Sequence, residues 1–305
     1  MEKMKPVTFT LTDKMTNELK KAYQEALKKS EFESLVKELH LPVELLMKHT
    51  SHLEEASIEY DHCKHCRGLL HCKNKITGYA YMPHIENGQV SFCYQACRYK
   101  QKKDKETKYL KNMKLLHVPD TMKQASMKDI YMDDERRFEV IKYITQFIKT
   151  YREDPHQKGL YLHGSFGSGK TYLVSAAFHE LAKKGVQSAM VFWPEMLNEL
   201  KESFHTGNFN EKMETLKKVP LLLIDDIGAE STTSWSRDEI LCPIVQYRMQ
   251  EHLPTFFTSN LTMQELEQHF RVSKDGVEHV KARRVMERIH QLTIDIELMS
   301  KNLRH

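Results

Sequence analysis

The stretch Gly164-Ser165-Phe166-Gly167-Ser168-Gly169-Lys170-Thr171 decides how the C-terminal part of this chain folds. It follows the short apolar run 159–163 and precedes the helical stretch 172–184, so the sequence predicts a strand, a glycine-rich turn and a helix. Glycines let backbone N–H groups converge on one point, where the positive end of the helix dipole also lies. The pattern G-x4-G-K-T in this setting therefore predicts a P-loop, which binds nucleotide phosphates.

The P-loop defines most of the expected nucleotide-binding residues. Lys170 is expected to hold the β- and γ-phosphates, and the Thr171 hydroxyl is expected to bind Mg²⁺. The expected cofactors are thus ATP and Mg²⁺. The residues assigned to nucleotide binding in this loop are Gly164, Ser165, Phe166, Gly167, Ser168, Gly169, Lys170 and Thr171.

A second motif, which ends in two acidic residues, follows at residues 219–226: Val-Pro-Leu-Leu-Leu-Ile-Asp-Asp. An apolar run that ends in acids is typical of a buried parallel strand that delivers carboxylates at its C-terminal edge. Asp225 fits the Mg²⁺-side acid of a Walker B motif, and Asp226 is placed to polarise the attacking water. At this distance after a P-loop the pattern predicts ATP hydrolysis.

A third apolar strand, residues 254–259, ends in Asn260. A polar side chain at that place is predicted to reach the γ-phosphate or the attacking water, which makes Asn260 a candidate catalytic residue. The alternative is that Asn260 caps or turns the chain before the next helix, which begins near residues 261–263.

Two arginines near the end of the chain lie one helical turn apart. The stretch 282–289, Ala-Arg-Arg-Val-Met-Glu-Arg-Ile, places Arg284 and Arg288 on one helix face. Exposed arginines are usually only solvated. In an oligomer driven by nucleotide, one of them would insert into the neighbouring site and stabilise the phosphate charge.

Five of the six cysteines lie between Cys63 and Cys97, in the order Cys63-x2-Cys66-x5-Cys72-x20-Cys93-x3-Cys97. A Cys-x2-Cys pair followed by later Cys or His residues has the spacing of a structural, tetrahedral Zn²⁺ site. Cys63 and Cys66 are the first choices, Cys72 and Cys97 the next, and Cys93 and His84 are substitutes. The alternative is a group of small buried thiols.

The pattern divides the chain into two domains and a linker. Residues 12–56 are predicted to be helical, and 78–81 and 89–92 to be short strands, so 1–100 form a small helical, zinc-binding domain that binds a partner. Residues 101–125 are expected to be a basic linker, because 98–123 hold nine basic residues against three acids. They are either solvated or bind phosphate. Residues 126–305 form the α/β nucleotide-binding domain.

Composition excludes several classes of protein. Hydrophobic residues make up 40% and charged residues 29% of the 305 residues, which excludes a disordered chain, a collagen and a disulfide miniprotein. No apolar run approaches the ~20 residues of a membrane span, and residues 1–20 lack the apolar stretch of a secretory signal. A cytoplasmic location, with no membrane partner, is therefore expected. The net charge of +4 permits a nucleic-acid partner without requiring one.

Taken together, the motifs resemble those of the AAA+ ATPases. The resemblance rests on the P-loop, on LLLIDDIGAE at 221–230, on FFTSN at 256–260 and on ARRVMERI at 282–289. Within that superfamily, these motifs and WSRDEILCPIVQYRM at 235–249 are similar to bacterial replicative-helicase loaders of the DnaI/DnaC type and to related transposition helper ATPases. The cysteine-rich N-terminal module resembles that of the DnaI-type primosomal loaders.

The resemblance implies a function. Such loaders bind the hexameric replicative DNA helicase through the N-terminal module and single-stranded DNA through the ATPase domain. They deliver the helicase onto single-stranded DNA during initiation or restart of chromosome replication, together with other primosome proteins. ATP hydrolysis is expected to be slow alone and stimulated by DNA and partner, with self-association through the ATPase domain.

The resemblance also assigns roles to residues. Asp225 and Asp226 match Walker B, Asn260 matches sensor 1, and Arg288 matches the arginine finger, with Arg284 one turn earlier. Arg304 falls where these loaders carry a nucleotide-binding sensor 2 arginine. Two departures are visible: Asp226 stands where many AAA+ proteins have Glu, and the chain stops soon after the arginine helix, which predicts a truncated lid.

Two other functions fit the same motifs. A transposition helper ATPase would share the ATPase domain, but these helpers generally lack a zinc module. A zinc-dependent DNA-binding adaptor would bind nucleotide without hydrolysing it. Turnover that rises with single-stranded DNA would argue against the adaptor.

Overall fold

The computed structural model describes residues 13–86, 89–131, 134–273 and 276–303. The described chain divides into two compact units, Met1–Lys108 and Tyr109–His305. No helix in these ranges is both long enough and apolar enough to cross a lipid bilayer. Short 3₁₀ helices lie at Leu69–His71, Lys108–Asn112, Met122–Gln124, Met127–Asp129 and Glu135–Arg137, and a π-helix at Trp235–Leu241.

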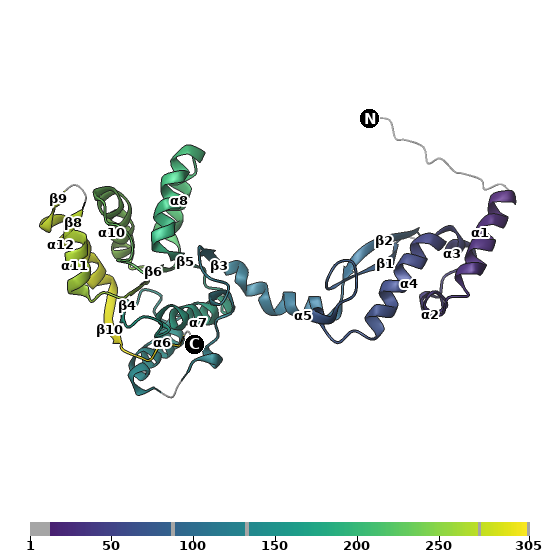
Figure 1. Cartoon of the computed structure of the whole chain (residues 1–305), viewed down its shortest axis with the longest axis horizontal. Coiled ribbons are helices and arrows are strands. Elements are labelled where there is room, and N and C mark those ends of the chain that lie inside the picture. Colours follow the sequence, from purple (N-terminus) through teal and green to yellow (C-terminus); the bar gives the residue numbers. More distant parts are fainter. Residues whose placement is uncertain (1–12, 87–88, 132–133, 274–275, 304–305) are drawn as a thin grey trace. The chain divides into compact units, whose positions relative to one another are not determined.

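The first unit packs helices against a β-hairpin (Figure 1). Phe32 and Leu35 of α2 and Leu53 of α4 are buried together, because apolar residues recur on one face of each helix. Tyr81 and Phe92 of the hairpin pack on this core. The elements are α1 (Asp13–Ala26), α2 (Ser30–Leu39), α3 (Val43–Lys48), α4 (Thr50–Lys64), the antiparallel strands β1 (Tyr79–Glu86) and β2 (Gln89–Ala96), and α5 (Arg98–Thr107).

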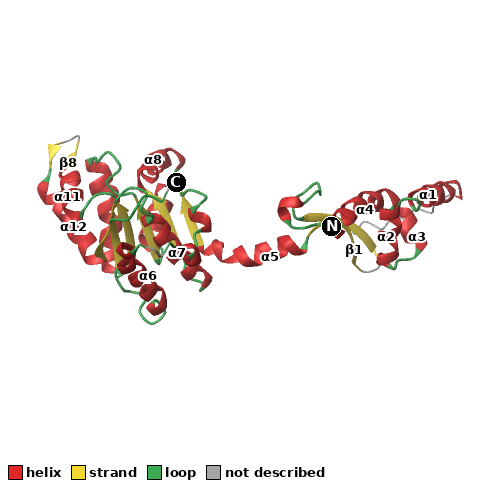
Figure 2. Ribbon diagram, turned by 60° about the horizontal axis from the view of Figure 1, so that its bottom comes forward, coloured by secondary structure: helices red, strands yellow, loops and turns green. Residues whose placement is uncertain are grey.

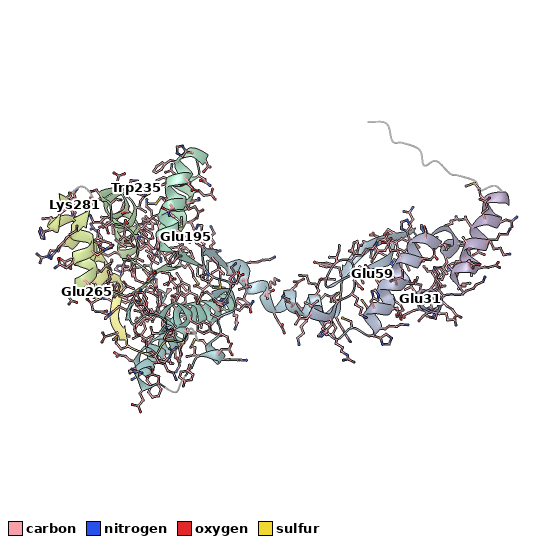
Figure 3. The ribbon with its side chains drawn as sticks, viewed as in Figure 1. Glu31, Glu59, Glu195, Trp235, Glu265 and Lys281 are labelled. Carbon is pink, nitrogen blue, oxygen red and sulfur yellow. The ribbon has the colours of Figure 1, made fainter. Side chains whose placement is uncertain are left out.

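A buried carboxylate joins the two parts of this unit. Glu59 of α4 is 3% exposed, and its carboxylate accepts hydrogen bonds from the backbone N–H groups of Lys75 and Tyr81. A buried acid needs such partners, because an unpaired one would cost several kcal/mol. Glu59 therefore fixes the hairpin to the helices; the side chain is labelled in Figure 3.

The second unit is built on a parallel sheet. Among the described residues, six strands form this sheet in the order β10-β4-β7-β6-β5-β3. The carboxyl ends of parallel strands meet at one edge, where α/β proteins bind ligands. The strands are β3 (Met113–Leu116), β4 (Gly159–Gly164), β5 (Ser188–Phe192), β6 (Leu221–Asp225), β7 (Thr255–Ser259) and β10 (Thr293–Leu298).

Helices cover both faces of the sheet (Figure 2). Leu160 and Leu162 of β4 face one core, while Tyr161 between them faces the other, as the two-residue period of a strand requires. The first face carries α6 (Phe138–Thr150) and α7 (Lys170–Lys183). The second carries α8 (Trp193–Thr206), α9 (Phe209–Lys218), α10 (Cys242–Gln250), α11 (Met263–Arg271) and α12 (His279–Leu292), and β8 (Val272–Ser273) pairs with β9 (Gly276–Val277) beside α11.

The segment 101–125, predicted to be a basic linker, contains a helix and a strand. Its first part continues α5, where Lys100 pairs with Asp104 at 2.6 Å one turn later. Its second part contains β3, whose Met113 is buried in the core of the second unit. Basic side chains spaced with acids four residues apart support a helix, and the apolar run after them supplies an edge strand. The division between units accordingly falls after Lys108, not around a linker at 101–125.

The end of the chain also contributes to the sheet. After α12 the chain enters β10, which pairs in parallel with β4, the strand that leads into the P-loop. A Cβ atom at Gly164 would lie 2.3 Å from the carbonyl oxygen of Leu298, so only glycine permits this close approach. After α12 the described chain thus continues as an edge strand of the sheet, beside the strand that leads into the P-loop.

Candidate nucleotide-binding site

The loop 165–169 connects β4 to α7 as the sequence predicts. Gly169 is the N-cap of α7 in the left-handed conformation, with φ of 86°, which a side chain would strain. The first N–H groups of α7 have no partner within the helix and lie at its positive end. The loop and helix therefore form an anion-binding site.

Lys170 lies at the centre of this loop and is 8% exposed. Its Nζ donates to the carbonyl oxygens of Gly164 at 3.0 Å and Ser165 at 2.9 Å. It also donates to Oδ1 of Asn260 at 2.8 Å. The ammonium group is thus held between the P-loop and the end of β7, where it can transfer its hydrogen bonds to phosphate oxygens.

Asp225 ends β6 with a buried carboxylate. Its Oδ1 accepts hydrogen bonds from the hydroxyl of Thr171 at 2.6 Å and from the hydroxyl of Thr258. Burial raises the pKa of Asp225, because desolvation disfavours the ionised form. A carboxylate and a hydroxyl that meet at one point match the oxygen ligands of Mg²⁺, so these residues fit that ion.

Asp226 and Asn260 form a second polar pair beside the first. Asp226 adopts the left-handed conformation, with φ of 58°, and its backbone N–H donates to the hydroxyl of Thr258 at 3.0 Å. Its Oδ1 accepts a hydrogen bond from Nδ2 of Asn260 at 3.1 Å. Asn260 therefore bridges Lys170 and Asp226. The alternative role as a helix cap falls to Thr262, which caps α11 together with Glu265.

A cavity of about 720 Å³ opens over these residues, within the size range of small-molecule sites. The loop from Phe166 to Thr171 lines it, together with Asp225, Asp226 and Asn260. Sequence reasoning missed other lining residues, among them His117, Tyr131, Arg137, Glu195 and Leu303. Glu195 stands at the first turn of α8 and is labelled in Figure 3. None of these residues belongs to a motif. The only sequence feature that could have drawn attention to Arg137 is the pair of arginines, Arg136 and Arg137, directly before α6.

The residues after β10 contact the P-loop; we call 299–303 the C-terminal strap. The Ser165 hydroxyl donates to the carbonyl oxygen of Ser300 at 2.8 Å. The backbone N–H of Leu303 donates to the carbonyl oxygen of Gly167 at 2.9 Å. Gly167 has a φ of 71°, a conformation that favours glycine, and a Cβ there would lie 2.0 Å from Oδ1 of Asn302, whose side chain would have to move. Arg304, assigned to nucleotide binding, lies outside the described residues.

The candidate finger arginines lie on α12 and do not line this cavity. The Arg288 guanidinium bonds within its own chain: Nε to Gln246, and Nη1 to the carbonyl oxygen of Arg284 at 2.8 Å. Arg284 itself is exposed and lines a separate polar pocket with Asp238 and Lys281.

Another arginine of the second unit, Arg248 on α10, is fully buried. Its guanidinium donates to the carbonyl oxygens of Val219 and Pro254 at 2.7 and 2.9 Å and to the hydroxyl of Thr255 at 2.8 Å. Burial lowers the pKa of Arg248 to about 9. Arg248 therefore holds α10 against the segment before β6 and the start of β7, and it is not accessible to a neighbouring protomer.

Four of the clustered cysteines, Cys63, Cys66, Cys72 and Cys97, line one pocket of about 260 Å³ in the first unit. Cys93, the substitute, is exposed on β2, and neither it nor His84 lines this pocket. Within the described ranges, however, no three Cys, His, Asp or Glu side chains are grouped closely enough to hold a metal ion.

Hydrogen-bond donors surround two of these sulfur atoms. Nδ2 of Asn74 donates to Sγ of Cys63 at 3.4 Å, and the backbone N–H of Gly78 donates to Sγ of Cys72 at 3.4 Å. Such donors stabilise thiolates, the form in which cysteine binds Zn²⁺. Burial nevertheless raises the pKa of the Cys63 thiol, which opposes its ionisation. Four cysteines are a ligand set that Zn²⁺ accepts, but their side chains are not grouped as a metal site here, and the metal stays a prediction.

Comparisons with known proteins agree with this geometry. The family model of the IstB-like ATP binding protein matches residues 100–304. The replicative helicase loader DnaI of Bacillus subtilis (strain 168) is 35% identical over 290 residues, which are 94% of this chain and 93% of that protein. A crystal structure of DnaI is 45% identical with a TM-score of 0.57, and covers 65% of this chain and 100% of its own.

A crystal structure of the DnaC helicase loader has a TM-score of 0.51 at 20% identity, and covers 59% of this chain and 99% of its own. At that identity the likeness concerns the fold alone. The match to DnaI, in contrast, extends through both units. The chain therefore belongs to the IstB-like ATP-binding proteins of the AAA+ superfamily and, within them, to the replicative helicase loaders of the DnaI/DnaC type.

Proposed function

We propose that this protein is an ATP-dependent loader that binds the hexameric replicative DNA helicase and delivers it onto single-stranded DNA during initiation or restart of replication. The observation that carries the proposal is the convergence of Lys170, Asp225 and Asn260 at the ends of adjacent strands. It occurs in a chain that matches DnaI over 94% of its length. The cytoplasm, where such an assembly works, is the proposed location.

The chemistry of the site supports ATP binding with Mg²⁺. On binding, Lys170 would give up the carbonyl oxygens of Gly164 and Ser165 for β- and γ-phosphate oxygens. Thr171 and Asp225 would hold Mg²⁺, which neutralises the phosphate charge. These residues lose little entropy on binding, because their side chains are already fixed.

The same arrangement supports slow hydrolysis. Asp226 would accept a proton from the attacking water, and the Asn260 amide would orient both that carboxylate and Lys170. Aspartate is one methylene shorter than glutamate, so its carboxylate reaches less far toward the water. We therefore propose that turnover is slow alone and increases when DNA and helicase reshape the site.

An arginine from a second protomer would complete the site. We keep Arg288 as the proposed finger, with Arg284 one turn away, since both lie on α12 away from the cavity of their own chain. Arg284 is the more exposed, whereas Arg288 would have to leave Gln246. This arrangement supports self-association through the ATPase unit; Arg304 is proposed to contact nucleotide from the same chain.

The first unit is proposed to contact the helicase and to hold a structural Zn²⁺. Cys63, Cys66, Cys72 and Cys97 would be its ligands, since all four line one pocket. A four-thiolate site has no open position and would only fasten the chain. The second unit is proposed to bind single-stranded DNA, and other primosome proteins are proposed as further partners.

Native mass spectrometry of this protein with the replicative helicase of the same organism, with and without ATP, tests the proposal. The expected result is a discrete assembly on a helicase hexamer, whose mass gives the stoichiometry. The Lys170→Ala variant is the control for the ATP-dependent part. Absence of a complex in every condition would overturn the loader function and favour a transposition helper.

A further inference from the structure

Three arginines of the described ranges, Arg137, Arg237 and Arg248, are buried to within 1% exposure, and their surroundings differ. Arg248 donates to several carbonyl oxygens, and Arg237 pairs with the carboxylates of Asp238 and Glu278. Both arrangements compensate the loss of water. Arg137 is different, because its guanidinium lines the nucleotide cavity.

Arg137 is poorly compensated by the protein itself. Its Nη1 donates to the carbonyl oxygen of Ser168 in the P-loop at 2.6 Å. Its Nε is buried and finds no hydrogen-bond partner within the part of the chain that the structure describes. A buried guanidinium with so few acceptors is costly to keep, unless an anionic ligand shares the cavity with it.

The contact with Ser168 determines how one P-loop peptide is oriented. In a trans peptide unit the C=O and N–H bonds point in opposite directions. Because the Ser168 carbonyl points to Arg137, the N–H of Gly169 points away from it. Gly169 and the Arg137 guanidinium lie close together: a Cβ at Gly169 would be 3.4 Å from Nη1 of Arg137. Glycine peptides rotate easily, so this orientation needs a partner that holds it.

The segment that carries Arg137 is held by hydrogen bonds around the cavity. Asp134, three residues earlier, accepts from the backbone N–H of Arg136 at 3.2 Å and from the Ser300 hydroxyl at 2.9 Å. Ser300 belongs to the C-terminal strap, and its carbonyl oxygen accepts from Ser165 of the P-loop. The segment 134–137, the P-loop and the strap therefore form a closed ring of hydrogen bonds.

We propose that Arg137 is a positioning residue of the nucleotide site, which keeps the Ser168–Gly169 peptide turned so that the Gly169 N–H faces the phosphates. The inference rests on the proposed function, since it concerns the same ATP site. The P-loop holds the β-phosphate of both nucleotides, so loss of Arg137 weakens ATP and ADP alike. Hydrolysis of bound ATP changes less, because the Arg137 guanidinium bonds to the P-loop carbonyl of Ser168, whereas Asn260 bonds to Asp226.

The test is equilibrium binding of fluorescent ATP and ADP analogues to the full chain. Arg137→Met is expected to raise the Kd of both nucleotides about tenfold or more, with a smaller change in kcat. Arg137→Lys keeps one donor for the Ser168 carbonyl and is expected to recover most of the affinity. Arg152→Met is the matched control: this arginine is exposed, lies after α6 and does not line the cavity, so its loss should leave Kd within about twofold.

The outcomes separate the inference from the function on which it rests. Unchanged affinity in Arg137→Met, with wild-type binding intact, overturns the positioning role alone. Equal losses in the Met and Lys variants, together with lowered melting temperatures, also overturn it, because they indicate a merely structural residue. A wild-type chain that binds neither analogue overturns the proposed ATP site and the inference with it. If Arg137→Met does not fold, Arg137→Gln takes its place with the same expectations.

Discussion

At the scale of one residue, the buried carboxylate of Asp225 lowers the stability of the folded protein, because its charge is removed from water. The Asp225 carboxylate is buried, and burial raises its pKa from the ordinary value of 3.8. Two hydroxyl groups, those of Thr171 and Thr258, donate to the same oxygen. An asparagine oxygen would accept both hydrogen bonds without the charge, so the charge is retained for a reason other than folding.

Asp225→Asn is therefore expected to stabilise the nucleotide-free protein at pH 7, by about 0.5–2 kcal/mol. A carboxyl whose pKa is raised by folding favours the folded state below its unfolded pKa of 3.8, and this contribution is lost as the pH rises through the raised value. Denaturant unfolding from pH 4 to pH 7 measures both effects. The wild type should lose stability relative to the variant along this series, and the variant should lose Mg²⁺-dependent nucleotide binding. A variant less stable than wild type at pH 7 would contradict this account.

Lys170→Ala is expected to abolish ATP binding, because it removes the positive charge from the centre of the loop's carbonyl and amide partners. The fold should persist, since alanine favours the first turn of α7. Isothermal titration with ATP measures the change, with the exposed Lys149→Ala of α6 as the control. Retained ATP affinity in Lys170→Ala would mean that the P-loop is not the nucleotide site.

At the scale of elements, Arg248 joins α10 to the segment before β6 and to the start of β7. Arg248→Met would leave several buried carbonyl oxygens without donors, so we expect a loss of about 3–5 kcal/mol in the free energy of unfolding. Urea unfolding measures it. The exposed Arg283→Met on α12 should change stability by less than about 0.5 kcal/mol. A loss in Arg248→Met no larger than in this control would show that Arg248 does not fasten α10.

The elements that sequence could predict are those whose signal is local. The strands Leu221–Asp225 and Thr255–Ser259 are buried at every residue, so each carries a short apolar run, and the glycines mark the loop before α7. The edge strand β10 mixes buried and exposed residues, so it has no continuous apolar run. It also directly follows α12, so no turn residue marks where it begins. Strand β3 has only four residues, which is too short for a periodic pattern to identify it.

The side chains of the site divide in the same way. Asp225 and Asn260 stand at the ends of recognisable strands and Lys170 stands at the start of α7 after the glycine-rich loop, and the structure brings the three together. Arg137 has its role only because Ser168, 31 residues away, points a carbonyl at it. The C-terminal strap likewise depends on pairing between segments 135 residues apart. Contacts of that range carry no periodicity, so a single sequence does not reveal them.

At the scale of the whole molecule, the two units should respond to metal removal independently. The four cysteines of the small pocket all belong to the first unit, whereas the nucleotide cavity is lined by the second. Each unit also has its own apolar core. If Zn²⁺ fastens the first unit, its removal takes away folding free energy there and leaves the ATPase unit intact.

A strong chelator added to the full chain is expected to lower the melting temperature of one transition and to leave the Kd for ATP unchanged. Metal analysis should find one Zn²⁺ per chain, and less in Cys63→Ser. Cys93→Ser is the matched control, since that residue lies outside the pocket. A chain that is purified without metal, or a Cys93→Ser variant that loses it, would refute the proposed ligand set.

The hydrogen bond from Leu303 to the P-loop has a practical consequence for handling the protein. Because Leu303 bonds directly to the carbonyl oxygen of Gly167, an affinity tag fused close behind Leu303 would begin beside the proposed phosphate site. Such a tag could disturb the hydrogen bond between Leu303 and Gly167, and measured nucleotide affinities would then include the effect of the tag. A purification handle is better attached before Met1, at the opposite end of the polypeptide.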